Sequence, residues 1–511
     1  MIRACKAAAA VVAALAIAIC PTAMHGQQSL EDIQRTQPVT VFDGVLSYIY
    51  GYPLMMEGVT ARTGTQVPNA KTKLGGAPLN QFGKEEELPN STFTAVVLPS
   101  TSTLYASSFI DLCEEPVILH IPSMGKRFFL LQMLDGWTEV SKQSPGTNKN
   151  SGPGDYALVG PTCKGTVQPE LSAGFVEVIK IPTSSMWIIG RIYTDGTTTD
   201  IQNVVDNIYP DLTLTPYRKY KAGKTYKPPK QVPVLAYGDV TTAPVKQVAS
   251  MDACAFFQNL ASLMNYNLPV LPQDVLVLPS LLRLGLVVRN NDPSKGNTPI
   301  MGTNFDCTAN TDKLASLQKA VGLAQKIMSN PNLQPGQTAT HWTVSLDVGT
   351  YGIKYLLRAI VAQDALGANR AEDAVYGYTT YDGSGALLDG SKNYTMHFDK
   401  FGLQRIPPVA KSGFWSLTIY DPNGKLILGP NQSIPPWNAV GQPTIQGHDP
   451  TINADGSLDL YLQAVDPGGA KHKNWVPIPP SGGFIGFLRM YSPKDAILNG
   501  NWIPPGITPP K

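Results

Sequence analysis

Short runs of β-branched and aromatic residues, repeatedly broken by Gly, Pro and Asp-Gly, dominate residues 92–192. Runs of this length with this punctuation predict antiparallel strands in a sandwich or barrel. The pattern returns after Tyr376, where Trp415–Tyr420, an Asp-Pro-Asn-Gly turn and a return run predict a β-hairpin. The chain has 46 Gly, 44 Pro and only 15% charged residues, which favours extended segments and turns over long helices.

The middle of the chain has a different period. Apolar residues recur at helical spacing in three segments: Met251–Asn267, Asp312–Asn330 and Lys354–Ala368. A further helix is expected at Val41–Met56, interrupted around Gly51 and Pro53 because proline removes a helical hydrogen bond. We therefore predict an α+β fold, mainly antiparallel β in sandwich or jelly-roll-like domains, with a helical middle segment.

A chain of 511 residues exceeds the size of one compact core, which rarely passes about 250–300 residues. Composition shifts divide it into a leader (1–26), an N-terminal β-rich domain (27–216), a Lys/Pro-rich linker or arm (217–250), a helical segment (251–375) and a C-terminal β-sandwich-like domain (376–511).

The N-terminus has the pattern of a secretory signal peptide. Arg3 and Lys6 precede an apolar run from Ala7 to Ile19. That run is shorter than the roughly 20 residues that span a bilayer. We expect cleavage near Ala23 or Gly26 and a soluble protein that is periplasmic or secreted, with no membrane span.

Loss of the leader leaves four cysteines, and an oxidising compartment permits three pairings among them. We favour Cys254 with Cys307 and Cys113 with Cys163, because each pair stays within one predicted region. Buried free thiols are the alternative.

Several function classes lack their sequence signature. The formal charge is +2 without a long basic run, so nucleic acid is not an expected partner. The chain has no G-x-S-x-G, no complete P-loop and no G-x-G-x-x-G after a strand. No two histidines of the mature chain stand at metal-ligand spacing, so we expect neither a metal nor another cofactor.

One acidic cluster accompanies an aromatic residue at a strand end. In "LDGWTEV", Asp135 and Glu139 flank Trp137. This combination suits a sugar or another polar ring, because the indole can stack on the ring while the acid accepts its hydroxyl protons. An Asp-Gly turn with a packed Trp is the simpler interpretation, and we weigh it above the first.

Aromatic residues with polar neighbours recur in the last third of the chain. A binding cleft uses such combinations, and core packing explains them equally well. The candidates for substrate binding there are Trp415, Tyr420, Trp475 and Arg489.

An ordered series of segments resembles a known pair of families. "LDGWTEV", "WIIGRIY", "YLLRAIVAQDALGAN", "GFWSLTIYD", "DGSLDLYLQ" and "LRMYSP" are similar to the domain-of-unknown-function families 1254 (N-terminal) and 1214 (C-terminal). The resemblance implies an exported bacterial protein, largely β-stranded with a helical middle. It implies no particular reaction.

The resemblance also bears on "LPSTSTLYASS" at residues 98–108. The family pattern Asp-Thr-Leu-Tyr is matched by Thr103, Leu104 and Tyr105, with Ser102 in the Asp place. A neutral hydroxyl therefore replaces an ionisable acceptor. Asn80 and Asp111 match the pattern.

Two hypotheses follow. The first is a hydrolase-type enzyme acting on a small organic or glycan substrate in a cleft between the β domains. Its catalytic candidates are Asp111, Asp135 and Arg358, with Tyr105 and Trp137 among the substrate-binding residues. Arg358 would pair with a substrate carboxylate or with a buried acid, and a structural ion pair is the commoner outcome.

The second hypothesis is a non-catalytic ligand-binding or oligomeric assembly protein. Its sheet faces would bind the ligand, and the arm at Tyr217–Pro233 would form the contacts of a homo-oligomer.

Overall fold

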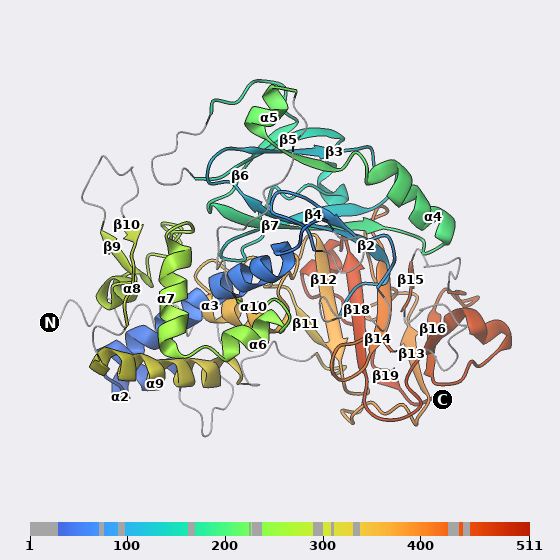
Figure 1. The fold of residues 1–511 in the computed structure, drawn as a ribbon. Helices are drawn as coiled ribbons and strands as arrows, with labels where there is room; N and C mark the ends of the chain where they lie inside the picture. The colour runs from blue at the N-terminus through green and yellow to red at the C-terminus, as the bar shows by residue number, and fades with distance from the viewer. Residues whose placement is uncertain are drawn as a thin grey trace.

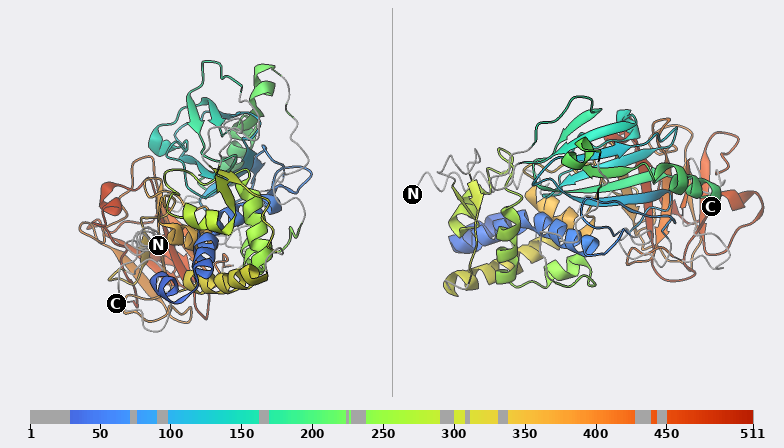
Figure 2. Two further views of the ribbon diagram at one scale, coloured as in Figure 1. Left: turned by 90° about the vertical axis from the view of Figure 1, so that its left-hand side faces the viewer. Right: turned by 45° about the horizontal axis from the view of Figure 1, so that its top comes forward.

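The computed structural model shows an α+β protein with three regions (Figure 1). It describes residues 29–510 except 71–75, 90–97, 162–168, 224–225, 227–237, 290–299, 308–310, 331–337, 428–438 and 443–449. The expected leader and part of the expected arm lie outside the described residues. Figure 2 shows the helical region and the C-terminal β domain at opposite ends, with the N-terminal β domain across both. No helix of the described part is long and apolar enough to cross a membrane.

The N-terminal domain is a sandwich of two four-stranded sheets. One sheet has the order β1 (Gly83–Lys84), β2 (Thr103–Asp111), β7 (Ser185–Tyr193) and β4 (Phe129–Asp135). The other has the order β6 (Glu177–Lys180), β5 (Gly154–Val159), β3 (Val117–Ile121) and β8 (Thr213–Pro216). Every pairing is antiparallel except that of β5 with β6. Alternate residues of each strand fill the core between the sheets, as the period of two in the sequence predicts.

The helical region is built around one long helix, α3 (Val39–Thr65). Around it lie α2 (Leu30–Thr36), α6 (Pro244–Ala249), α7 (Ala253–Met264), α8 (Leu278–Leu284), α9 (Thr311–Met328) and α10 (Tyr355–Asp364). Helices α7, α9 and α10 confirm the three segments predicted from apolar spacing. The helical region therefore combines α3, which precedes the N-terminal β domain in sequence, with helices that follow that domain (Figure 1).

The predicted interruption of the first helix is wrong, because α3 continues through Gly51 and Pro53. A Cβ on Gly51 would lie 2.4 Å from a methyl carbon of Leu260, so glycine allows α7 to approach closely. Pro53 removes one hydrogen bond, and burial of the helix on nearly all sides offsets that cost.

Two sheets form the C-terminal domain. The first has the order β11 (Thr343–Ser345), β12 (Ala374–Thr379), β18 (Ile485–Tyr491), β14 (Trp415–Tyr420) and β15 (Ala439–Gln442). The second has the order β17 (Trp475–Pro477), β16 (Leu458–Gln463), β13 (Tyr394–Phe398) and β19 (Ile507–Thr508). The predicted turn after β14 is confirmed, because the Gly424 amide donates to the Asp421 carbonyl over 3.0 Å and Gly424 has φ +74°. The shorter pieces outside these sheets are β9 (Val287–Arg289), β10 (Ile300–Gly302), α4 (Thr198–Asn203), α5 (Tyr217–Lys221) and α11 (Asp495–Leu498).

The two β domains meet face to face. The surface of the β2–β7–β4 sheet that points away from its own core lies against the corresponding surface of β12, β18 and β14 (Figures 1 and 2). Phe128 packs edge-on against Phe414 at 5.4 Å between ring centroids, and Tyr193 lies 4.8 Å from Phe414. This contact brings residues more than 200 positions apart into one layer.

One predicted disulfide is confirmed, that of Cys254 on α7 with Cys307. Cys113 is also disulfide-bonded, whereas Cys163 lies outside the described residues. The two bonded cysteines of the helical region are 53 residues apart in sequence.

We expect a C254S/C307S variant to lose about 2–4 kcal/mol of unfolding free energy, because the bond restricts a long loop of the unfolded chain. Urea unfolding measures the loss, and Ala255→Ser on the same helix is the control for the substitution itself. A double variant as stable as the wild type would contradict a stabilising role for this bond.

Candidate functional site

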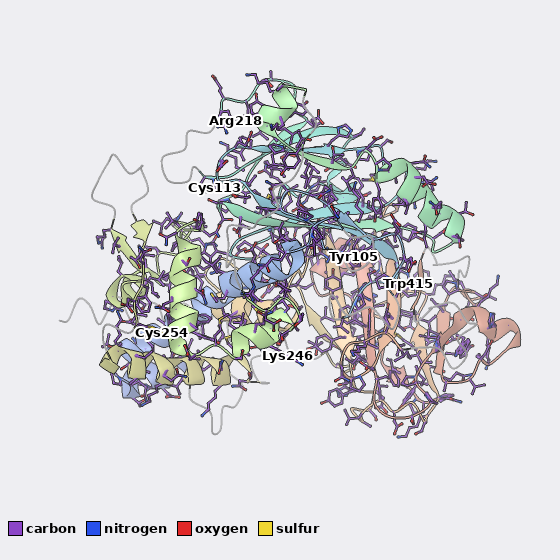
Figure 3. All side chains as sticks on the ribbon, viewed as in Figure 1. Tyr105, Cys113, Arg218, Lys246, Cys254 and Trp415 are labelled. Carbon is purple, nitrogen blue, oxygen red and sulfur yellow. A yellow bond between two sulfur atoms is a disulfide. The ribbon has the colours of Figure 1, made fainter. Side chains whose placement is uncertain are left out.

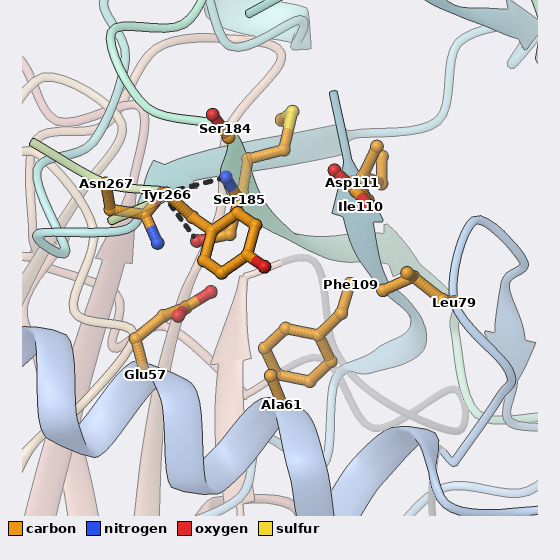
Figure 4. A pocket seen from close by; sticks show the side chains of 11 residues that line it. Glu57, Ala61, Leu79, Phe109, Ile110, Asp111, Ser184, Ser185, Tyr266 and Asn267 are labelled. Atoms are coloured by element: carbon orange, nitrogen blue, oxygen red, sulfur yellow. Dashed lines mark hydrogen bonds between the residues drawn. The ribbon is translucent and has the colours of Figure 1, made fainter. Parts of the chain in front are cut away.

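A small cavity lies between α3 and the ends of β2 and β7 (Figure 4). We call it the Glu57 cavity. Its volume is about 30 Å³, enough for about one or two water molecules. The lining residues are Glu57, Ala61, Leu79, Phe109, Ile110, Asp111, Ser184, Ser185, Met186, Tyr266 and Asn267.

The polar end of the cavity holds two groups without a hydrogen-bond partner among the described residues. These are Oε1 of Glu57 and the side-chain amide nitrogen of Asn267, both buried. The amide oxygen of Asn267 accepts from the Ser185 backbone N–H at 2.9 Å and from its hydroxyl at 3.1 Å, which fixes the orientation of the amide. Figure 4 shows the Asn267 amide and the Glu57 carboxyl facing the same space beside the Tyr266 ring. Buried polar atoms normally have partners, so this end is suited to a polar guest.

The remaining walls are mostly apolar. Phe109 lines the cavity and stacks on Trp187 with 4.9 Å between ring centroids. The Trp187 indole nitrogen donates to the Ser107 hydroxyl at 2.8 Å, which holds this pair against the outer surface of the sheet. The cavity thus combines a few fixed polar groups with an apolar wall, as small-molecule sites do.

Asp111 lines the cavity from the end of β2 and is half-buried. Its Oδ1 accepts from the Cys113 amide at 2.8 Å, and its own N–H donates to the Asn80 side-chain oxygen at 2.9 Å. Burial raises the pKa of Asp111, while the Cys113 N–H acts in the opposite direction. The two acids that line this cavity are therefore Glu57 and Asp111.

A third carboxyl group stands behind the polar end, at the last residue of β4. Asp135 Oδ1 accepts from the backbone N–H groups of Trp137 at 2.8 Å and Glu139 at 3.0 Å. A Cβ on Gly136 would lie 2.9 Å from the Ser185 hydroxyl oxygen. Glycine therefore lets the turn after β4 pack directly against the polar end of the Glu57 cavity.

The two buried acids of this region hold their protons unusually tightly. Burial, helped by the Asp135 charge and opposed by Ser185, raises the pKa of Glu57 to about 8. Burial and the Glu139 charge raise the pKa of Asp135 to about 7, against the lowering effect of Arg358. Glu57 is therefore mainly protonated at neutral pH and can donate its proton.

Arg358 on α10 is wholly buried beside Asp135. Its guanidinium carbon lies 5.2–5.6 Å from the ring centroids of three aromatic residues, which we call the Arg358 cage: Tyr50, Trp137 and Tyr355. None of its three guanidinium nitrogens has a hydrogen-bond partner among the described residues. The faces of the aromatic rings, together with charges at longer range, therefore stabilise the guanidinium cation.

Two carboxylates flank this guanidinium. Glu139 lies 3.8 Å from Nη1 and Asp274 lies 4.0 Å from Nη2 of Arg358. Asp274 also accepts from the Tyr50 hydroxyl at 2.7 Å, and the Glu139 carboxylate accepts from the Tyr351 amide at 3.0 Å. Arg358 lowers the pKa of both acids, although burial raises each of them more.

The structure places the residues predicted from sequence in more than one location. Asp111 lines the Glu57 cavity, and Asp135, Trp137 and Arg358 gather behind it. Tyr105, Tyr420 and Arg489 lie together between the two β domains, as the position of Tyr105 in Figure 3 shows. These groups do not share one pocket.

The remaining two predicted residues pack elsewhere. Trp415 belongs to the core of the C-terminal domain, on the opposite surface of its sheet from Arg489. The Trp475 indole donates to the Gln463 carbonyl at 2.8 Å in the second sheet of that domain. Both have the packing role that was the alternative to ligand binding.

Sequence reasoning missed Glu57, Ser185 and Asn267. A signal for Glu57 was present, because it is the one acid in the apolar stretch from Val45 to Val59 of a helix. Ser185 and Asn267 meet only through tertiary packing, and nothing in their local sequence marks them. Within the described part of the chain, no cluster of three His, Cys, Asp or Glu residues has the arrangement of a metal site.

Comparisons with known proteins give two family matches and one similar fold. Residues 79–216 match the family described as "Protein of unknown function (DUF1254)", and residues 373–495 match "Protein of unknown function (DUF1214)". The crystal structure of the VPA0106 protein from Vibrio parahaemolyticus is similar, with a TM-score of 0.63 and 20% identity over 93% of this chain and 100% of that one. At this identity the likeness extends to the fold. An uncharacterised protein from Burkholderia cenocepacia aligns with a TM-score of 0.37 and 9% identity over 99% of this chain and 94% of that one. No curated protein matches the chain.

Proposed function

For a chain that pairs a DUF1254 domain with a DUF1214 domain, we propose a hydrolase-type activity on a small neutral substrate at the Glu57 cavity. The observation that supports it most is the Glu57 carboxyl: wholly buried, protonated at neutral pH and exposed to the cavity through an unpartnered oxygen. A general acid needs a pKa near the working pH and access to the leaving group.

The proposed roles follow from the positions of the two acids. Asp111, which is half-buried, acts as the base and takes a proton from a water molecule as that oxygen bonds to the substrate carbon. Glu57 gives its proton to the leaving oxygen as the bond between carbon and that oxygen breaks. Exchange with solvent then restores both protonation states. The unpartnered Asn267 amide nitrogen is placed to donate to a substrate oxygen.

The charge of the cavity restricts the substrate class. Two of its lining residues are acids, and none of them is Lys, Arg or His. An anionic substrate would be repelled, so a neutral ester or glycoside fits better than a phosphate ester. The volume admits only a small reacting group, with the rest of the molecule lying outside the cavity.

We also propose that the protein is exported from the cytoplasm. The disulfide between Cys254 and Cys307 supports it, because such bonds persist mainly in oxidising compartments. Peptide sequencing of the mature N-terminus would test it, and a chain that keeps Met1 would count against it.

A panel of neutral esters, glycosides and phosphomonoesters tests the activity. We expect turnover of a neutral compound and none of the phosphates. If a compound raises the melting temperature without forming product, the chain is instead a ligand-binding protein. Equal turnover by wild type and Asp111→Asn would remove Asp111 from the proposed mechanism.

A further inference from the structure

Two buried arginines lie between the sheets of the two β domains, away from the Glu57 cavity. Arg191 on β7 stands opposite Tyr105 of β2, and Arg489 on β18 stands opposite Tyr376 of β12 and Ser416 of β14. The exposed fraction is 8% for Arg191 and 3% for Arg489. We call these residues the arginine pair.

Neutral acceptors contact Arg191. Its Nη1 donates to the Gln132 side chain at 2.6 Å and to Asn369 at 3.2 Å. Its two contacts with backbone carbonyls, those of Ile189 and Gly367, are both long at 3.4 Å. Long bonds to neutral carbonyls leave a guanidinium able to bind a stronger acceptor.

Arg489 is likewise held by uncharged groups. Its Nη1 donates to the Thr418 hydroxyl at 3.1 Å, and its Nη2 donates to the Leu98 carbonyl at 2.6 Å and the Tyr420 hydroxyl at 2.7 Å. The guanidinium also lies 4.4 Å from the centre of the Phe487 ring.

Neither member of the arginine pair forms an ion pair within the described part of the chain. By contrast, the buried Arg358 has two carboxylates within 4.0 Å. Burial lowers the pKa of Arg191 and the like charge of Arg489 acts in the same direction, but Tyr376, Tyr105 and Tyr491 together outweigh them, so the pKa is raised and the guanidinium stays charged. Burying two cations without a counter-charge is costly, since desolvation exceeds what neutral acceptors return.

Unpartnered donors stand beside the pair. The Ser416 hydroxyl, opposite Arg489 in the ladder, and the Thr103 hydroxyl, two residues before Tyr105 on the same surface of β2, are buried without a hydrogen-bond partner among the described residues. Tyr105 and Tyr376 are only half-buried, so this group of residues has an edge that solvent reaches.

We propose that the arginine pair is the binding site of a small oxyanion, a carboxylate or a phosphate, held between the DUF1254 and DUF1214 domains. The anion supplies the missing counter-charge, accepts from both guanidinium groups and takes the free hydroxyl donors. It thereby ties β7 of one domain to β18 of the other. This site is independent of the proposed hydrolase activity, whose cavity is acidic.

Thermal unfolding of the full chain at fixed ionic strength tests the proposal. Inorganic phosphate and acetate are each titrated, with chloride as the reference salt. Comparing the two shows whether the site prefers a phosphate or a carboxylate. We expect a rise in melting temperature that saturates with one or both oxyanions, because binding to the folded state stabilises it by mass action. A non-specific salt effect does not saturate in this way.

The variants R191Q and R489Q should lose the saturable rise, whereas R218Q, at an exposed arginine of α5, should keep it. A rise that does not saturate, or that is equal in wild type and in R191Q or R489Q, overturns the proposal. If neither variant folds, the wild-type titration alone tests the proposal. A wild-type melting temperature that responds to phosphate and acetate no differently than to chloride also overturns the proposal.

Discussion

Replacing Arg358 by Met is expected to lower the unfolding free energy by about 3–5 kcal/mol, because it leaves buried carboxylates without their cation. Glu139 and Asp274 lie within 4.0 Å of the guanidinium. Met retains the length of the side chain and fills the Arg358 cage, so the loss reports charge more than volume. Urea unfolding at neutral pH measures it.

The size of this loss should depend on pH. Arg358 lowers the pKa of Glu139 and Asp274, so its removal raises both values and favours the protonated acids. Protonation relieves the unpaired charge. The deficit should therefore be smaller in mildly acidic buffer and grow as the pH rises.

Arg35→Met is the matched control, since that side chain is 70% exposed and its pair with Asp32 contributes at most about 1 kcal/mol. Adding E139Q and D274N to Arg358→Met should recover part of the stability. An Arg358→Met protein as stable as the wild type would show that the guanidinium does not hold these acids.

Replacing Glu57 by Gln is expected to lower kcat for the neutral substrate by roughly 10²–10⁴-fold, the usual contribution of a general acid. The amide keeps the shape of the side chain and has no acidic proton. In the wild type, kcat/KM should fall as the pH rises through about 8, where Glu57 loses its proton. In Glu57→Gln this decline should disappear from the residual rate.

Glu85→Gln is the matched control for that variant. Glu85 is also buried and burial raises its pKa to about 8, but it does not line the cavity. A loss of similar size in Glu85→Gln would indicate a general effect of buried charge. Unchanged turnover in Glu57→Gln would exclude Glu57 as the acid.

The elements of the fold were predictable where local pattern decides them. Alternating runs predicted β7 and β18, and apolar spacing predicted α7 and α9, because each element buries one surface. The order of matching segments also indicated both families correctly.

The course of α3 was less predictable, because it depends on what surrounds the helix. Gly51 and Pro53 are helix breakers by local rules, and tertiary packing overrides them. The same packing turns a helix near the N-terminus into the centre of a region whose other helices, apart from α2, follow the N-terminal β domain in sequence.

The candidate site was predictable only in part. Asp111 was identified from the family pattern, and Asp135 with Arg358 from their residue types and positions. Their separation into a cavity and a buried cluster behind it depends on how α3 crosses the end of the sheet. Glu57 owes its raised pKa to that crossing, which no local pattern shows.

The most direct test of this account is the protonation state of Glu57. The infrared C=O stretch of a protonated carboxylic acid, taken as the wild-type spectrum minus that of Glu57→Gln, reports this residue alone. We predict that the band persists well above the ordinary Glu pKa of about 4.3 and disappears as the pH rises through about 8. A band already lost near about pH 5 would show an ordinary surface-like carboxylate and contradict the assignment of Glu57 as the acid.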